Sequence, residues 1–158
     1  MRRLVAGLIA AFCVLSVAHV RAADEFEPIT DAVGVRRVLE EVALDVGGTE
    51  GQFTARYRHT RIVVHANERH GRLRIMTPVV AESDLSAQEL RILLSANYGR
   101  ALDARYAIGD GVVWALFIRP LAGMDRRTFL DGADQVVNLK RNFGTSYRST
   151  DLTFGRLP

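Results

Sequence analysis

Cysteine is almost absent from this sequence of 158 residues: Cys13 is the only one, and it lies in an apolar run near the N-terminus. We expect that run to be removed, which leaves a mature chain without cysteine. Such a chain can form no disulfide, no thiolate zinc site and no cysteine nucleophile. Its stability must come from the hydrophobic core alone, and the length is sufficient for one single-domain core.

Familiar catalytic motifs are also missing. The sequence contains no G-x-S-x-G elbow, P-loop, G-x-G-x-x-G or H-E-x-x-H pattern. It therefore predicts a protein that is not an enzyme, needs no cofactor and has no identifiable small-molecule substrate or metal site. His59, His65 and His70 lie close together in the sequence near Glu68, and surface histidines are the simpler interpretation. The alternative is a small metal-dependent periplasmic enzyme that uses these three histidines.

Long hydrophobic runs are confined to the N-terminus. Arg2 and Arg3 precede an apolar run over residues 4–17, which is shorter than the ~20 residues of a membrane span. Small residues at 20 and 22 suit a cleavage site near Ala22. We expect residues 1–22 to be a secretory signal peptide, so that the protein is exported to the periplasm or secreted. An N-terminal membrane anchor is the alternative.

An excess of charge is absent from the expected mature chain. The sequence has 21 Lys and Arg and 18 Asp and Glu. Three of the arginines and none of the acids lie in residues 1–22, so 18 basic and 18 acidic groups remain. This balance argues against nucleic acid as a partner. Membrane contact stays open.

Arginine is nevertheless concentrated in one region. Residues 53–74 contain six arginines and a single acid, Glu68. Strand alternation over this region places Arg56, Arg58, Arg72 and Arg74 on the outward face of one sheet. A solvated face is one interpretation. The sharper one is a docking surface for an acidic polypeptide, a lipid headgroup or a polyanion.

Hydrophobic periodicity and turn signals predict the remaining elements. We expect helices over residues 31–46, 86–99 and 125–143, two or three strands over 52–80, and two strands over 104–108 and 112–118. Capping residues support the three helix starts: Thr30 or Asp31 for the first, Ser86 for the second and Asp125 for the third. The prediction is an α+β fold with an antiparallel sheet of about five strands, in the order α-β-β-β-α-β-β-α. Residues 23–28 would be a flexible leader, 29–144 the domain and 145–158 a C-terminal tail.

The strand expected over residues 112–118 is apolar on both faces. One face carries Trp114 and the other carries Phe117. A core position is the simpler interpretation of both aromatic residues. The alternative is a surface for a dimer or a client protein, because a strand that is apolar on both sides needs a cover on each. A purely structural homodimer therefore also remains open.

The pattern L-x-x-L-L-x-x-N, formed by Leu90, Leu93, Leu94 and Asn97 and followed by the hairpin over residues 104–119, resembles YbjN-like domains over about residues 29–144. That family is similar in fold to type III secretion chaperones. The resemblance implies an α+β sandwich, a tendency to dimerise and non-enzymatic protein binding or regulation, with no catalytic residues. The predicted signal peptide departs from it, since secretion chaperones work in the cytoplasm.

The sequence thus predicts an exported protein-binding or regulatory module on a chaperone-like scaffold. Its partner would be another protein or a second copy of the chain. The candidate partner-binding residues are Arg56, Arg58, Arg72, Arg74, Trp114 and Phe117.

Overall fold

The computed structural model describes residues 27–152, so the predicted signal peptide, most of the leader and the end of the tail lie outside the described residues. Within that part the chain forms three α-helices and one antiparallel sheet of six strands, ordered β1-β2-β3-β4-β6-β5. The elements are α2 (Ala32–Val42), β1 (Leu44–Thr49), β2 (Gln52–Tyr57), β3 (Thr60–Asn67), β4 (Arg72–Ala81), the 3₁₀ turn η1 (Glu82–Asp84), α3 (Ala87–Gly99), β5 (Arg105–Gly109), β6 (Val112–Pro120) and α4 (Arg126–Arg141). The predicted α+β class is confirmed.

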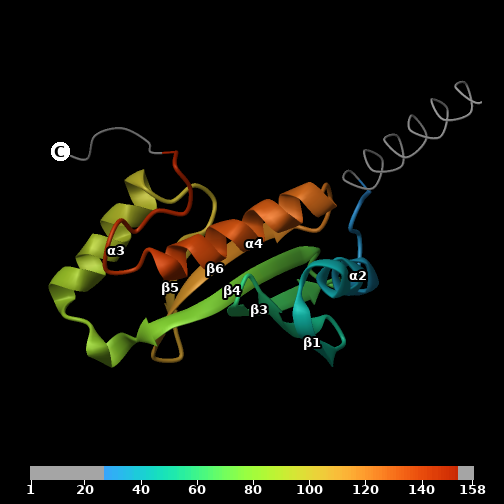
Figure 1. The fold of residues 1–158 in the computed structure, drawn as a ribbon, viewed down its shortest axis with the longest axis horizontal. Helices are drawn as coiled ribbons and strands as arrows, with labels where there is room; N and C mark the ends of the chain where they lie inside the picture. The colour runs from blue at the N-terminus through green and yellow to red at the C-terminus, as the bar shows by residue number, and fades with distance from the viewer. Residues whose placement is uncertain (1–26, 153–158) are drawn as a thin grey trace, which may run out of the picture.

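Two helices cover one face of the sheet. α2 contacts β1, β2 and β3, whereas α4 contacts β4, β5 and β6. A row of directly opposed residues crosses four strands beneath these helices, and all of its members are buried: Phe53, Val64, Ile75 and Phe117. Figure 1 shows α4 lying along the sheet, with α2 at one end of the molecule and α3 at the other.

The helix starts lie where the capping residues predict them. The Asp31 carboxylate accepts a hydrogen bond from Gly34 N at 2.8 Å, and Asp125 accepts one from Thr128 N at 2.7 Å. That backbone hydrogen bond is the main reason why the pKa of Asp125 lies below its ordinary value. Ser86 and Glu89 form the complete capping box of α3. These signals are local, so the sequence reveals them directly.

The first helix is shorter than predicted, and β1 is the strand that the sequence did not predict. α2 ends at Val42 and the chain turns into an edge strand, with a bulge between Leu44 and Gly47 where Asp45 adopts a φ of 53°. Gly48 has a φ of 98°, and a Cβ there would lie 2.1 Å from Gln52 O. The Gly47-Gly48 pair therefore shapes a hairpin with β2 and does not end a helix.

Helix α3 lies at the edge of the sheet beside β5. The Asn97 amide pairs with the outer edge of that strand: its Nδ2 donates to Tyr106 O at 2.9 Å, and its Oδ1 accepts from Tyr106 N at 2.8 Å. Leu93 is buried, but Leu94, predicted on the same apolar face, is 70% exposed. A helix against one edge strand buries a narrower stripe than a helix across a sheet face.

The described part of the predicted tail, residues 145–152, folds back onto the domain. Ser149 is buried, its Oγ accepts from Leu102 N at 2.7 Å, and its carbonyl accepts from Asn138 Nδ2 at 3.0 Å. These bonds tie the segment to α4 and to the loop before β5. The boundary predicted between domain and tail therefore crosses a continuous set of contacts.

Candidate functional site: the open face of the sheet

The open face of the sheet, which is the face opposite α2 and α4, carries a continuous set of apolar side chains. Among the described residues, the helices contact the other face or the β5 edge. Strand register places Val63 opposite Met76, Met76 opposite Leu116, and Pro78 opposite Trp114. These side chains are half-buried or exposed. We call the following set the apolar stripe: Val63, Met76, Pro78, Trp114, Leu116 and Ile118.

Trp114 is held in a defined position within the apolar stripe. Its indole Nε1 donates to Gly109 O at 3.1 Å, which ties the ring to the end of β5. The side chain is half-buried, and it is the only tryptophan in the sequence. Its fluorescence therefore reports on the open face without a label.

Phe117 does not belong to this surface, and its assignment as a partner contact is wrong. The side chain is only 1% exposed and points to the helix-covered face. It lies so close to α4 that a Cβ on Gly132 would be 2.6 Å from its ring. β6 is apolar on both sides, but only one side is covered. α4 packs on the side that carries Phe117, and the side that carries Trp114 is left open.

Next to Ile118, the open face contains a hollow of about 380 Å³ with basic walls. Its lining residues, which we call the basic pocket, are His65, Asn67, His70, Arg72, Arg74 and Ile118. His65 is directly opposite Arg74 on the neighbouring strand, and Ile118 is opposite Arg74 on the other side. Two of the four predicted arginines thus lie together at one end of the apolar stripe.

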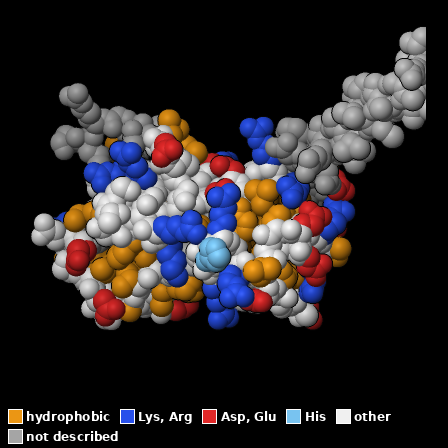
Figure 2. Space-filling view, in the orientation of Figure 1, with side chains coloured by type: hydrophobic (Ala, Val, Ile, Leu, Met, Phe, Trp, Pro, Cys, Tyr) orange, Lys and Arg blue, Asp and Glu red, His pale blue; other side chains and the backbone are white. Residues whose placement is uncertain are grey.

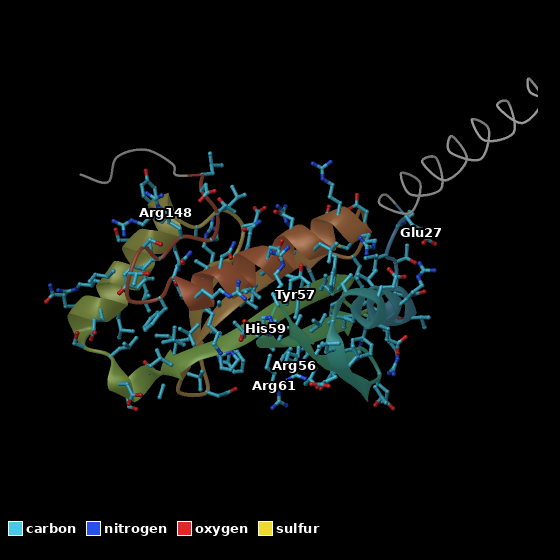
Figure 3. The ribbon with its side chains drawn as sticks, in the orientation of Figure 1. Glu27, Arg56, Tyr57, His59, Arg61 and Arg148 are labelled. Carbon is cyan, nitrogen blue, oxygen red and sulfur yellow. The ribbon has the colours of Figure 1, made fainter. Side chains whose placement is uncertain are left out.

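The other two predicted arginines lie elsewhere. Arg56 is in β2 and pairs with Asp45 at 2.5 Å. Arg58 lies beyond the end of β2, in a turn where it and His59 both have positive φ, and its Nε is 2.9 Å from Asp134 Oδ1 of α4. Period-two alternation cannot hold across this turn, so placing Arg58 with the outward-facing arginines was wrong. In Figure 2 basic side chains gather around a histidine, and Figure 3 labels His59 there with Arg56 and Arg61 nearby.

The three histidines do not form one site. His59 precedes β3, whereas His65 and His70 lie toward its other end and both line the basic pocket. The described residues include no group of three or more His, Cys, Asp or Glu placed to hold a metal ion. Burial, and then the positive charge of Arg74, lower the pKa of His65 below its ordinary value. Arg74, directly opposite His65, makes this position unfavourable for a metal cation.

The guanidinium groups of the basic pocket have no acidic counterpart in the described structure. Arg72 and Arg74 are exposed, and no carboxylate oxygen of a described residue lies within 4.0 Å of either. The nearby Glu68 is engaged in another contact, because its Oε1 accepts from Ala32 N of α2 at 2.8 Å. Arg72 Nη1 donates to Gly71 O at 3.3 Å, so the pocket offers the remaining donors of Arg72, the guanidinium of Arg74 and an imidazole to a carboxylate or another oxyanion. Sequence alternation foresaw the arginines but not the adjacent histidines.

Similar folds occur in solved protein complexes. The chain matches a chain of the HopA1–SchA chaperone–effector complex with a TM-score of 0.53 and 16% identity, over 73% of this chain and 89% of that one. It matches a chain of the ExsC–ExsE complex with a TM-score of 0.53 and 18% identity, over 74% of this chain and 97% of that one. The fold is chaperone-like, as the sequence resemblance implied.

No protein-family model and no curated protein sequence matches the chain. Among the described helices, none is both long enough and apolar enough to cross a membrane.

Proposed function

We propose that this protein is an exported, non-enzymatic binding module that holds a segment of another protein on its open face. The apolar stripe carries the proposal, because a contiguous set of large apolar side chains on the surface of a soluble domain marks an interaction site. α2 and α4 pack on the other face of the sheet and support the strands beneath the apolar stripe. A bound segment would provide the second cover that the apolar stripe lacks.

The fold comparison supports a protein as the ligand. One similar chain comes from a chaperone–effector complex and another from the ExsC–ExsE complex, so the scaffold is compatible with binding a polypeptide. Export rests on the signal-peptide pattern in residues 1–22. A relationship to YbjN-like domains is part of the same proposal, supported by the leucine and asparagine pattern of α3 before the β5–β6 hairpin.

A peptide titration tests the proposal. The ligand is a synthetic peptide of about 12 residues in which leucine alternates with a polar residue, long enough to cross the face when extended. Trp114 fluorescence reports binding. We expect Met76→Ser and Leu116→Ser each to weaken binding at least tenfold, because burying such a side chain contributes about 1.5–3 kcal/mol.

The matched control is Leu94→Ser, which removes an exposed leucine from α3, away from the open face. It should leave the affinity unchanged. Equal affinity for the peptide in the unaltered protein and in all three variants would overturn the proposal. Light scattering with size exclusion tests a second copy as the occupant: a dimer that Leu116→Ser dissociates and Leu94→Ser does not would assign the open face to self-association.

A further inference from the structure

We infer that the basic pocket binds a carboxylate of the partner, so that the protein selects acidic amphipathic segments over neutral or basic ones. This inference rests on the proposed function of the open face and adds the chemistry of the partner. Its starting point is a juxtaposition: the apolar stripe ends at Ile118, and Ile118 is also a wall of the basic pocket. A ligand that fits both must carry apolar and acidic side chains close together.

The strand register gives the basic pocket its geometry. Arg72 and Arg74 are two residues apart on β4 and so project from the same face, roughly 7 Å apart along the strand. His65 is the cross-strand neighbour of Arg74, and Asn67 is that of Arg72. Alternate residues of an extended peptide have the same spacing as the two arginines. Two acidic residues that are two positions apart, in phase with the apolar residues that contact the apolar stripe, would therefore match them.

Charge complementarity favours an acidic partner. The wall of the basic pocket contains no acidic side chain, and neither arginine has a carboxylate partner among the described residues. The half-buried His65 lies directly opposite Arg74, and burial, followed by the charge of Arg74, lowers the pKa of its imidazole. A carboxylate placed here gains charge-assisted hydrogen bonds and relieves the repulsion between the basic groups.

Two competing occupants fit less well. The strands contribute five arginines to the open face: Arg56, Arg61, Arg72, Arg74 and Arg105. Among the described residues, the only acid that forms an ion pair with one of them is Asp45. Two copies that met through this face would bring like charges together, which costs free energy. A polyanion such as heparin would satisfy the arginines but leave the apolar stripe uncovered.

The test compares three peptides of one length on the unaltered protein. In each, leucine alternates with serine, and the two leucine positions nearest one end are replaced by glutamate, by glutamine or by lysine, so that these residues share a side with the leucines. We expect the glutamate peptide to bind about tenfold more tightly than the glutamine peptide at low salt, as partly exposed ion pairs allow, and the lysine peptide to bind most weakly. The difference between glutamate and glutamine should shrink at ~0.5 M salt, where exposed charges are screened. Trp114 fluorescence is again the readout.

A pair of double variants locates the effect. Arg72→Gln with Arg74→Gln should remove the preference for glutamate while leaving the affinity for the glutamine peptide unchanged. The control, Arg91→Gln with Arg127→Gln, removes the same charge from exposed positions on α3 and α4 and should keep the preference. An equal loss in both double variants would mean that net charge acts without a site, and would overturn the inference.

The remaining outcomes separate the inference from the proposed function. Equal affinity for the glutamate and glutamine peptides would overturn the basic pocket as a selector while leaving the open face as a binding site. Displacement of the glutamate peptide by heparin at comparable affinity would assign the pocket to polyanions and overturn the inference. If no peptide binds the unaltered protein, the proposed function fails, and the inference fails with it.

Discussion

Gly132 in the middle of α4 provides a sharp test of how closely this helix packs on the sheet. Glycine is a poor helix former, and replacing it with alanine in a helix ordinarily stabilises a protein by about 1 kcal/mol. Here a Cβ would lie 2.6 Å, 2.7 Å and 2.8 Å from three ring carbons of Phe117. Phe117 is fully buried and cannot swing into solvent. We therefore predict that Gly132→Ala destabilises the protein.

The magnitude follows from two opposing effects. Forcing a methyl group into a filled core costs about 1–3 kcal/mol. The gain in helix propensity offsets about 1 kcal/mol of that cost. The free energy of unfolding should thus fall by roughly 1 kcal/mol, within a range of about 0–2 kcal/mol.

Urea unfolding followed by circular dichroism measures this difference, and the chain offers a matched control. Gly34 is a buried helical glycine in α2, where a Cβ would lie 3.4 Å from Asp31 Oδ1 and 3.5 Å from Ile29 Cγ2, which is ordinary contact. Gly34→Ala should therefore stabilise the protein by up to about 1 kcal/mol. Adding Phe117→Leu to Gly132→Ala should cost less than the two single changes combined, because the smaller side chain makes room. Stabilisation by Gly132→Ala, equal to that by Gly34→Ala, would refute the close packing of α4.

Three further predictions concern polar groups. Asn97→Asp keeps the acceptor for Tyr106 N but loses the donor to Tyr106 O, so the free energy of unfolding in urea should fall by about 1–3 kcal/mol. Gln135→Met leaves two backbone N–H groups unpaired, one of them on Ala104, and should cost about 1–3 kcal/mol for each group in the same assay. Burial, and then the neighbouring Arg74, lower the pKa of His65, so as the pH falls the unfolded chain takes up a proton at this imidazole before the folded protein does. The free energy of unfolding should therefore fall between about pH 7.5 and about pH 5, and it should fall less steeply in His65→Gln. Urea midpoints at the two pH values measure the difference.

The sequence predicted those parts of the fold that depend on neighbours along the chain. The capping box of α3 and the caps of α2 and α4 each involve residues three apart, so no tertiary information is needed. The alternation in β2 and β4 likewise showed which side chains share a face. This is why Arg72 and Arg74 were correctly placed side by side.

The errors arose where a distant element decides the outcome. Gly47-Gly48 can end a helix or shape a hairpin, and pairing with β2 selects the hairpin. Phe117 and Trp114 look equivalent in an apolar strand, and only the position of α4 buries the first and leaves the second at the surface. His65 joins the basic pocket because its strand pairs with β4, which places it opposite Arg74.

The edges of the sheet clarify how a partner would bind. An open strand edge invites strand addition, because its N–H and C=O groups are unpaired. At the β5 edge, Asn97 already occupies the N–H and the C=O of Tyr106. At the other edge, β1 is short and bulged, and its Asp45 carboxylate is paired with Arg56. Both edges are thus obstructed, while the face between them presents the apolar stripe and the basic pocket to solvent. A partner would therefore be recognised through side chains on the open face, where the apolar stripe and the basic pocket can distinguish one segment from another.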